Sequence, residues 1–170
     1  MRRAFLLFGL AGLLCVSASA QQARRATTRT FARPDRTHVY LKWLNEDVPY
    51  IITEEERRAF RMLKSDEERE QFVEAFWRRR DLDPVTPLNE YREEHYRRVA
   101  YANEHFTHDH AAGWKTDRGR IYIKHGQPDE VLKSVRGETW VYKVLPGVGN
   151  NVEMLFLLNP ATGDFQLQMR

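Results

Sequence analysis

Residues that could do chemistry gather between positions 113 and 120, where the chain reads Gly-Trp-Lys-Thr-Asp-Arg-Gly-Arg. In a functional interpretation, Trp114 is a stacking platform, Asp117 is a general acid or base, and Arg118 clamps an anion. These residue types suit the roles, because an indole offers a large ring face, a carboxylate exchanges protons and a guanidinium binds anions in a bidentate way. The segment is therefore the first candidate for a functional site.

A structural interpretation explains the same segment without a ligand. We expect it at a junction between helices and a sheet, where a buried Trp114 fills the space between the layers and its indole N–H bonds one partner. Thr116 and Asp117 then bond the backbone of a turn, and Gly119 supplies a backbone conformation that other residues rarely adopt. We prefer this interpretation. The signature comprises Gly113, Trp114, Thr116, Asp117, Arg118, Gly119 and Arg120.

The carboxylates Asp117, Asp129 and Glu130 form a second arrangement with chemical potential. Two carboxylates at a set separation hydrolyse glycosidic bonds, one as an acid and the other as a base or nucleophile. Asp129 follows Pro128, however, and an aspartate in that position is at least as often a turn former. The sequence leaves open whether the three carboxylates lie close together.

Nucleophilic catalysis has little support. Ser65 and Ser134 are the only serines beyond residue 20, and neither lies in a Gly-x-Ser-x-Gly turn. The single cysteine, Cys15, lies in a segment that we expect to be removed, so the mature chain should have no thiol nucleophile and no disulfide.

Three histidines, His105, His108 and His110, cluster with Asp109 and invite a metal-site interpretation. Ligands on a helix need a spacing of three or four residues, and the stretch after residue 107 is predicted to lie beyond a helix. The chain also contains no His-Glu-x-x-His motif. We therefore expect a solvated loop here, with no metal and no cofactor.

The first 20 residues have the pattern of a signal peptide. Arg2 and Arg3 precede an apolar run over residues 4–16, and Ala18-Ser19-Ala20 predicts cleavage before Gln21. The apolar run is 13 residues long, shorter than the roughly 20 that a membrane-spanning helix needs. A lipoprotein alternative would use Cys15 as the anchor, but it requires a small residue where Leu14 stands. We expect a mature chain of about 150 residues with one core.

Charge argues against a nucleic-acid partner. The chain has 27 basic and 24 acidic residues, for a formal net charge of +3. Residues 21–36 are predicted to form a basic flexible linker, and residues 21–34 contain four arginines and no acid. No extended basic face is predicted elsewhere, and no segment after the leader is apolar enough to span a membrane.

Residues 37–106 are predicted to be helical. Thr53 with Glu56, and Ser65 with Glu68, match capping boxes that open two helices, and a short helix is expected near residues 38–46. Basic residues at 78–80 suit the negative end of a helix dipole. We expect the inward-facing residues to include Val39, Trp43, Leu44, Ala59, Phe60, Leu63, Phe72, Val73, Phe76 and Trp77.

The clearest helix spans residues 88–106. Apolar positions recur there at intervals of three and four, which places them on one helical face: Leu88, Tyr91, His95, Val99, Ala102 and Phe106. His95 lies on this face and is expected to be a hydrogen-bonded core histidine rather than a catalyst.

The pattern changes after residue 112. Residues 120–125 alternate, with Ile121 and Ile123 on one face, which predicts a strand. Further strands are expected near residues 131–135, 140–144, 152–158 and 165–169, separated by turns. Helices followed by adjacent antiparallel strands indicate an α+β fold. We predict one domain over 37–170, helical over 37–106, with an antiparallel sheet of about four strands within 114–170.

The segment 111–130 resembles the signature of the GWxTD domain family, found in exported proteins of Acidobacteria and related bacteria. Gly113, Trp114, Thr116 and Asp117 match the naming motif, and the residues after it match its usual continuation. Residues 76–81, 92–99 and 146–151 are also similar, so the resemblance covers roughly residues 50–160. The histidines at 105, 108 and 110 stand where the family has variable polar residues. The resemblance implies no particular activity.

We expect an exported binding or assembly module of the bacterial cell envelope, periplasmic or extracellular, whose partner is a protein or an envelope polymer. Nine phenylalanines, seven tyrosines and four tryptophans could supply anchors for binding. One alternative is a carboxylate-dependent hydrolase acting on envelope glycan or peptide, and another is a structural module of a larger secreted complex. A cleft lined by Asp117 would favour the hydrolase, whereas a flat apolar patch would favour the binding module.

Overall fold

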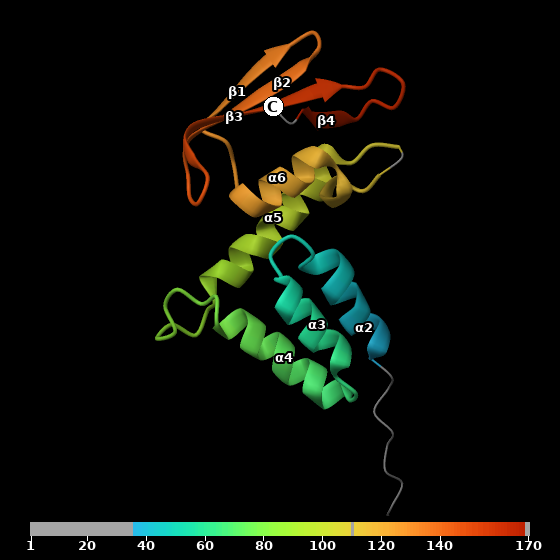
Figure 1. Ribbon diagram of the computed structural model, residues 1–170, viewed down its shortest axis with the longest axis vertical. Helices are drawn as coiled ribbons and strands as arrows, with labels where there is room; N and C mark the ends of the chain where they lie inside the picture. The colour runs from blue at the N-terminus through green and yellow to red at the C-terminus, as the bar shows by residue number, and fades with distance from the viewer. Residues whose placement is uncertain (1–35, 110, 169–170) are drawn as a thin grey trace, which may run out of the picture. The chain divides into compact units, whose positions relative to one another are not determined.

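The computed structural model describes residues 36–109 and 111–168 (Figure 1), all within the compact unit Asp35–Arg170. The predicted signal peptide, and the predicted linker up to residue 35, lie outside the described residues. Helices come first and an antiparallel sheet follows, which confirms the α+β fold class.

The helical part begins with α2 (Thr37–Lys42), which continues as the π-helical turn η1 (Trp43–Asp47). It goes on through α3 (Glu54–Met62), α4 (Asp66–Arg78) and the long α5 (Glu90–Phe106). The 3₁₀ turn η2 (Gly113–Lys115) and α6 (Asp117–His125) complete it. None of the helices in the described ranges combines the length and the apolar character needed to cross a membrane.

Helix α6 corrects the strand predicted over residues 120–125. Ile121, Tyr122 and Ile123 are all buried, so the alternation of apolar residues did not mark a half-exposed strand. Thr116 caps the helix by accepting a hydrogen bond from the Gly119 N–H, and Gly126 follows the helix at a φ of 83°. The helical part therefore extends to residue 125, and the sheet occupies residues 130–168 rather than 114–170.

Both predicted capping boxes are present. Thr53 and Ser65 accept from the backbone N–H groups of Glu56 and Glu68, whose carboxylates bond back to the cap residues. The inward-facing predictions hold for Trp43, Leu44, Phe60, Phe76 and Trp77, which are buried, and in part for Leu63, Phe72 and Val73. They are wrong for three residues that solvent reaches: Val39, Ala59 and Leu88.

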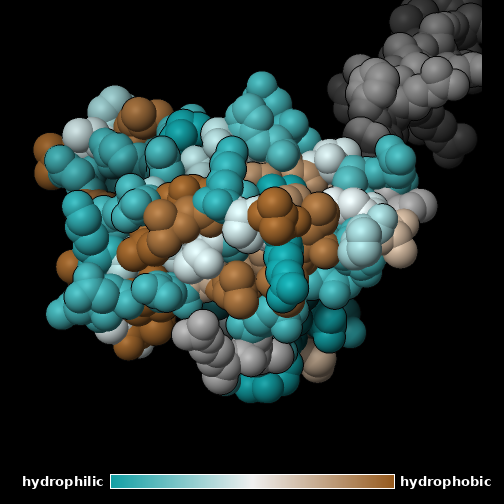
Figure 2. Space-filling model, turned by 90° about the horizontal axis from the view of Figure 1, so that it is seen from above, coloured by the Kyte–Doolittle hydropathy of each residue, from teal (hydrophilic) through white to brown (hydrophobic). Residues whose placement is uncertain are grey.

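The sheet is an antiparallel meander in the order β1-β2-β3-β4, with bounds Glu130–Ser134, Gly137–Leu145, Gly149–Leu158 and Phe165–Gln168. Trp140, Tyr142 and Phe156 point from one face into a core that α5 and α6 cover. Val144 and Leu158 continue the same face but are exposed. The register directs the neighbouring residues to the other face, which Figure 2 shows as hydrophobic side chains among hydrophilic ones: Leu132, Val141, Leu155 and Leu157.

A second core lies among α2, η1, α3 and α4, and α5 connects the two cores. The first half of α5 contributes Tyr91 and Tyr96 to the helical core, and the second half of α5 contributes Ala102 and Phe106 to the core beneath the sheet. His95 is buried, and its Nε2 lies 2.6 Å from the Asp47 carbonyl oxygen, as expected of a core histidine.

Glu56 holds α3 to the end of α4. Its carboxylate accepts two hydrogen bonds from the Arg80 guanidinium, at 2.7 and 3.0 Å, and one from Arg79 at 2.8 Å. Arg80 also lies 3.6 Å from the Phe76 ring centroid and donates to the Phe76 and Ile51 carbonyl groups. The basic residues at the end of α4 thus do more than complement a helix dipole.

This clamp predicts a specific loss of stability in acid. Burial alone raises the pKa of Glu56, but the hydrogen bonds from Arg80 and Arg79 outweigh it and lower the pKa from 4.5 to about 2. A carboxyl whose folded pKa is depressed stabilises the fold above its unfolded pKa, and this contribution disappears as pH falls from 4.5 towards 2. Glu56→Gln should therefore lower the free energy of unfolding by up to about 3 kcal/mol at neutral pH, and by much less near pH 2. Urea unfolding of both proteins across this pH range measures the difference, and a difference independent of pH would contradict the clamp.

Candidate functional site

Thr116 organises the start of the signature. It is buried, and its hydroxyl donates to the Gly113 carbonyl oxygen at 2.8 Å while accepting from the Gly119 N–H at 3.0 Å. The side chain therefore gives a hydrogen-bond partner to one backbone carbonyl of η2 and to one backbone N–H in the first turn of α6. It connects the two elements across a tight corner.

Gly113 and Gly119 are required by close packing. A Cβ on Gly113 would lie 1.8 Å from the Ala102 carbonyl oxygen in α5, and a Cβ on Gly119 would lie 1.9 Å from the Gly113 carbonyl oxygen. Our prediction that Gly119 adopts a backbone conformation closed to other residues is wrong, because Gly119 lies within the regular helix α6. Its missing side chain lets two backbones meet.

Trp114 is partly buried rather than enclosed. Its ring packs against the core beneath the sheet and lies 6.2 Å from the Tyr50 ring, with the Lys115 ammonium 5.1 Å from its centroid. Its backbone is held on both sides, since Asn103 Oδ1 accepts from its N–H at 3.1 Å and Tyr50 Oη donates to its carbonyl at 3.0 Å. The residue joins α5 to the loop before α3, and the expectation of a fully buried plug is corrected.

Asp117 connects α6 to the last strand. Its Oδ2 accepts from the Leu167 N–H of β4 at 2.8 Å, and its Oδ1 accepts from Arg120 at 2.8 Å. Both carboxylate oxygens therefore have partners within the fold. Asp117 bonds backbone as predicted, but the backbone belongs to a strand 50 residues away rather than to its own turn.

Arg118 lies between helix and sheet against an internal anion. Its guanidinium is 3.3 Å from Glu138 Oε1, the same oxygen that accepts from the Trp140 indole N–H at 2.9 Å. The guanidinium carbon also lies 3.8 Å from the Phe165 ring centroid and 4.9 Å from that of Phe106. The anion that Arg118 clamps is therefore a side chain of the protein itself.

The three predicted carboxylates are not brought together. Asp129 Oδ2 accepts from the Lys143 N–H at 2.8 Å, next to the start of β1, whereas Asp117 binds β4 at the opposite edge of the sheet. Lys143 of β2 lies opposite residue 151 of β3, whereas Leu167 of β4 pairs with Phe156. The two backbone partners are therefore about five residues, or roughly 16 Å, apart along the strands, beyond the spacing of glycosidase carboxylates. Glu130 is exposed on β1.

The histidines separate into different environments. The His105 ring packs edge-on against Tyr101 with centroids 4.0 Å apart, and His108 Nε2 lies 3.4 Å from Asp164 Oδ1. His110 lies outside the described residues. Within the described part of the chain, no group of three or more His, Cys, Asp or Glu side chains is placed to hold a metal ion.

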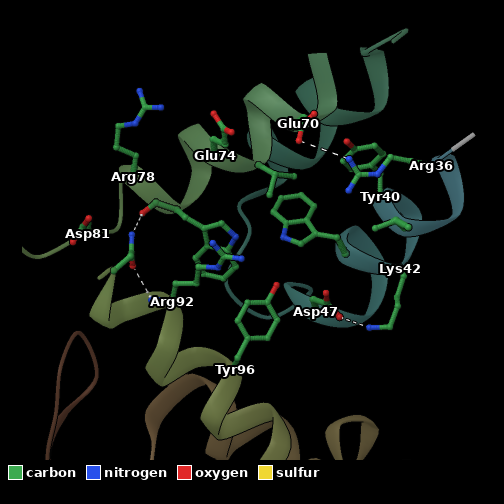
Figure 3. Close-up of a pocket in the computed structure, with 15 residues that line it drawn as sticks. Arg36, Tyr40, Lys42, Asp47, Glu70, Glu74, Arg78, Asp81, Arg92 and Tyr96 are labelled. Atoms are coloured by element: carbon green, nitrogen blue, oxygen red, sulfur yellow. Dashed lines mark hydrogen bonds and ion pairs between the residues drawn. The ribbon is translucent and has the colours of Figure 1, made fainter. Parts of the chain in front are cut away.

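Sequence reasoning missed a groove of about 580 Å³ in the helical part, which α2, η1, α4 and α5 line (Figure 3). We call it the aromatic groove, because its walls include four aromatic residues with polar tips: Tyr40, Trp43, Trp77 and Tyr96. Figure 3 shows Tyr96 rising from α5 with its hydroxyl directed into the groove beside Asp47. The volume falls within the range of about 300–1,000 Å³ typical of ligand pockets.

Three hydrogen-bonding groups of the aromatic groove have no partner within the described residues. They are Tyr40 Oη, Trp43 Nε1 and Trp77 Nε1. Their residues are only 6%, 5% and 4% exposed, so bulk solvent scarcely reaches them. An unpaired buried donor costs about 1–3 kcal/mol, and most buried polar groups in proteins have partners.

The rim of the groove is charged but balanced. Four cations line it (Arg36, Lys42, Arg78 and Arg92), together with four carboxylates (Asp47, Glu70, Glu74 and Asp81). Lys42 binds Asp47 at 2.6 Å and Arg36 lies 3.7 Å from Glu70 (Figure 3). Arg78 and Glu74 have no ion-pair partner in the ranges that the structure describes.

Tyr96 is a neutral hydrogen-bonding group at the groove. Burial, and then the neighbouring Asp47 carboxylate, raise the pKa of Tyr96 to about 12. Burial likewise lowers the pKa of His95, whose ring lies 5.5 Å from that of Tyr96. At neutral pH both rings are therefore uncharged.

The sequence does contain one signal for this site. Trp43 and Trp77 each carry an indole N–H into a predicted core, and a buried indole normally requires an acceptor. No acceptor can be assigned to either residue from the sequence, because α2, α4 and α5 come together only in the folded chain. Two buried indole donors in the helical half are therefore the one feature of the sequence that points to this region.

Close packing at Gly113 predicts a severe effect of a single methyl group. Gly113→Ala should lower the free energy of unfolding by more than about 3 kcal/mol, because the backbone of α5 cannot move away as a flexible side chain would. Gly147→Ala is the control: Gly147 has a φ of 76° but nothing within 4 Å, so only the backbone strain of about 1–2 kcal/mol is expected. Chemical denaturation measures both free energies of unfolding. If the two variants lose the same amount, close packing is not the reason for glycine at position 113.

The Arg118–Glu138 pair predicts a large effect of removing one partner. Glu138→Ala leaves the Arg118 guanidinium and the Trp140 N–H without their shared acceptor, which should destabilise the fold by about 3–5 kcal/mol. Glu153→Ala, at an exposed position of β3, should stay within about 0.5 kcal/mol of the original protein. Thermal and urea unfolding of the two variants test this, and a Glu138→Ala protein as stable as the control would refute the buried pair.

The family model of the GWxTD domain matches residues 12–168, a longer stretch than the roughly 50–160 that the sequence motifs suggested. Searches of curated proteins and of solved structures found no match. The match covers most of the chain and includes every element from α2 to β4. The chain belongs to the GWxTD domain family.

Proposed function

We propose that the protein is an exported binding module of the cell envelope, and that its ligand occupies the aromatic groove. The observation that carries this proposal is the set of three unpartnered groups, Tyr40 Oη, Trp43 Nε1 and Trp77 Nε1, around one groove. A ligand with acceptor oxygens would give these groups hydrogen-bond partners.

The contacts of the signature favour binding over hydrolysis. Both oxygens of Asp117 already hold internal partners, and the Asp129 carboxylate bonds the β2 backbone. A general acid or base must reach its substrate, so a carboxylate that is fully engaged in the fold is poorly suited to the task. We therefore interpret the signature as scaffold and the groove as the functional surface.

Location at the envelope rests on the pattern at the N-terminus. Arg2, Arg3, the apolar run and the Ala-Ser-Ala sequence support export to the periplasm or the exterior. There the partner would be a protein or an envelope polymer. The apolar side chains on the outer face of the sheet (Figure 2) support a role in assembly as well, since exposed apolar patches mark interaction sites.

Binding in the groove can be followed without knowing the ligand. Each tryptophan gives one indole N–H signal in the ¹H–¹⁵N spectrum, and the chain has four. On titration with a fractionated envelope extract, the signals of Trp43 and Trp77 should move, because their N–H groups gain acceptors. The Trp140 signal should not move, because its N–H already bonds Glu138. Movement of all four signals, or of none, would contradict binding in this groove.

A pair of variants on one helix sharpens the test. Val39 and Leu41 are both 51% exposed in α2, but of the two only Val39 lines the aromatic groove. Val39→Asp should weaken the response to the extract by about tenfold or more, because it places a charge at an apolar wall. Leu41→Asp should leave the response unchanged, and both variants should keep the original melting temperature within a few degrees. Equal responses from the two variants would exclude the groove.

A further inference from the structure

The residues that line the aromatic groove indicate the chemical class of its ligand. The inference below rests on the proposed function. We infer that the ligand is a polypeptide segment that inserts one apolar anchor side chain into the groove and offers backbone carbonyl oxygens to the indole N–H groups of Trp43 and Trp77. Three independent features lead to this class: the charge of the rim, the burial of the two indole rings and the hydrogen-bonding chemistry of the unpartnered groups.

The balanced rim disfavours polyanions and polycations. Four cations and four carboxylates share the opening, so an anionic lipid surface or a nucleic acid would face carboxylates as often as cations. Recognition of such polymers requires clustered basic charge. A polypeptide carries both signs on neighbouring side chains, and Arg78 and Glu74 remain available to pair with them.

The ring faces disfavour a glycan. The Trp43 ring packs against Phe60 and Phe76 with centroids 5.2 and 5.1 Å apart. The Trp77 ring packs against Phe76, His95 and Tyr96 at 5.0 to 5.5 Å. The two residues are only 5% and 4% exposed, so little of either ring face is left for a sugar ring to stack on. Their N–H groups have no partner within the described residues, and such groups call for an acceptor atom rather than a flat ring.

The free groups and the walls match a peptide. Both indoles can only donate hydrogen bonds, so the ligand must supply acceptors, as a peptide backbone does at every residue. Val39 and Val73 add aliphatic surface to the same groove. An apolar side chain packed between them would remove its surface from water, and buried anchors of this kind carry most of the affinity in peptide recognition.

The decisive experiment compares defined probes on the ¹⁵N-labelled full chain. One probe is a pool of blocked hexapeptides with a central leucine or phenylalanine and varied Lys, Glu and Ser flanks. The second is the same pool with a central serine. The third is an N-acetylglucosamine tetramer, and the fourth is vesicles of phosphatidylglycerol. The indole signals of Trp43 and Trp77 report binding, and the Trp140 signal is the internal reference.

We expect the apolar-centred pool to move the Trp43 and Trp77 signals in a saturable way, with an apparent Kd below about 1 mM. The serine-centred pool should bind about tenfold more weakly or not at all, because it lacks the anchor. Val39→Asp should abolish the response to the apolar pool, and Leu41→Asp should preserve it. Because both substituted positions are half exposed, loss of folding would not explain the difference.

Other outcomes separate the ligand class from the binding role. A response to the tetramer or the vesicles but not to the peptides would overturn the polypeptide inference and leave the proposed function standing. So would a response to the envelope extract alone, or equal responses to the two peptide pools. If neither the extract nor any probe moves the two signals, both the inference and the proposed function are wrong.

Discussion

The contact between the backbones of η2 and α5 is the constraint on which the rest of the structure depends. With a hydrogen in place of a side chain at Gly113, the turn approaches the Ala102 carbonyl to a distance that no Cβ would permit. Gly119 of α6 is in turn so close to the Gly113 carbonyl of η2 that no Cβ would fit there either. Helix α6 is therefore set directly on α5. Only from that position can Asp117 reach the Leu167 N–H of β4.

The same placement determines how the sheet attaches to the helices. Arg118 projects from α6 towards Glu138, and the shared acceptor Glu138 Oε1 joins helix α6 to the Trp140 indole in β2. Charged groups between layers are expensive to desolvate, so they are retained where each has a partner of the right geometry. Burial of the apolar core beneath the sheet, to which Phe156 and Ile121 belong, stabilises the contact between the layers, whereas the polar contacts select one orientation of the sheet.

The sequence predicts local features well and long-range ones poorly. Capping boxes at Thr53 and Ser65 are local hydrogen-bonding patterns, and both are present. The α+β class followed from periodicity, but α6 was mistaken for a strand because a short helix buried on several sides loses the 3.6-residue pattern. The roles of the two signature glycines depend on backbone atoms of α5 and η2. The aromatic groove forms only where α2, η1, α4 and α5 come together. Neither can be deduced from spacing along the chain.

Helix α5 contributes both to the signature and to the aromatic groove. The second half of α5 holds the signature through Ala102 and Asn103, whereas its first half contributes Tyr96 to the aromatic groove. Four polar side chains of the signature bind partners inside the fold: Thr116, Asp117, Arg118 and Arg120. A match to the signature therefore identifies how the chain folds and says little about what it binds. Under the proposed function, specificity resides in the residues that line the groove, which the naming motif does not include.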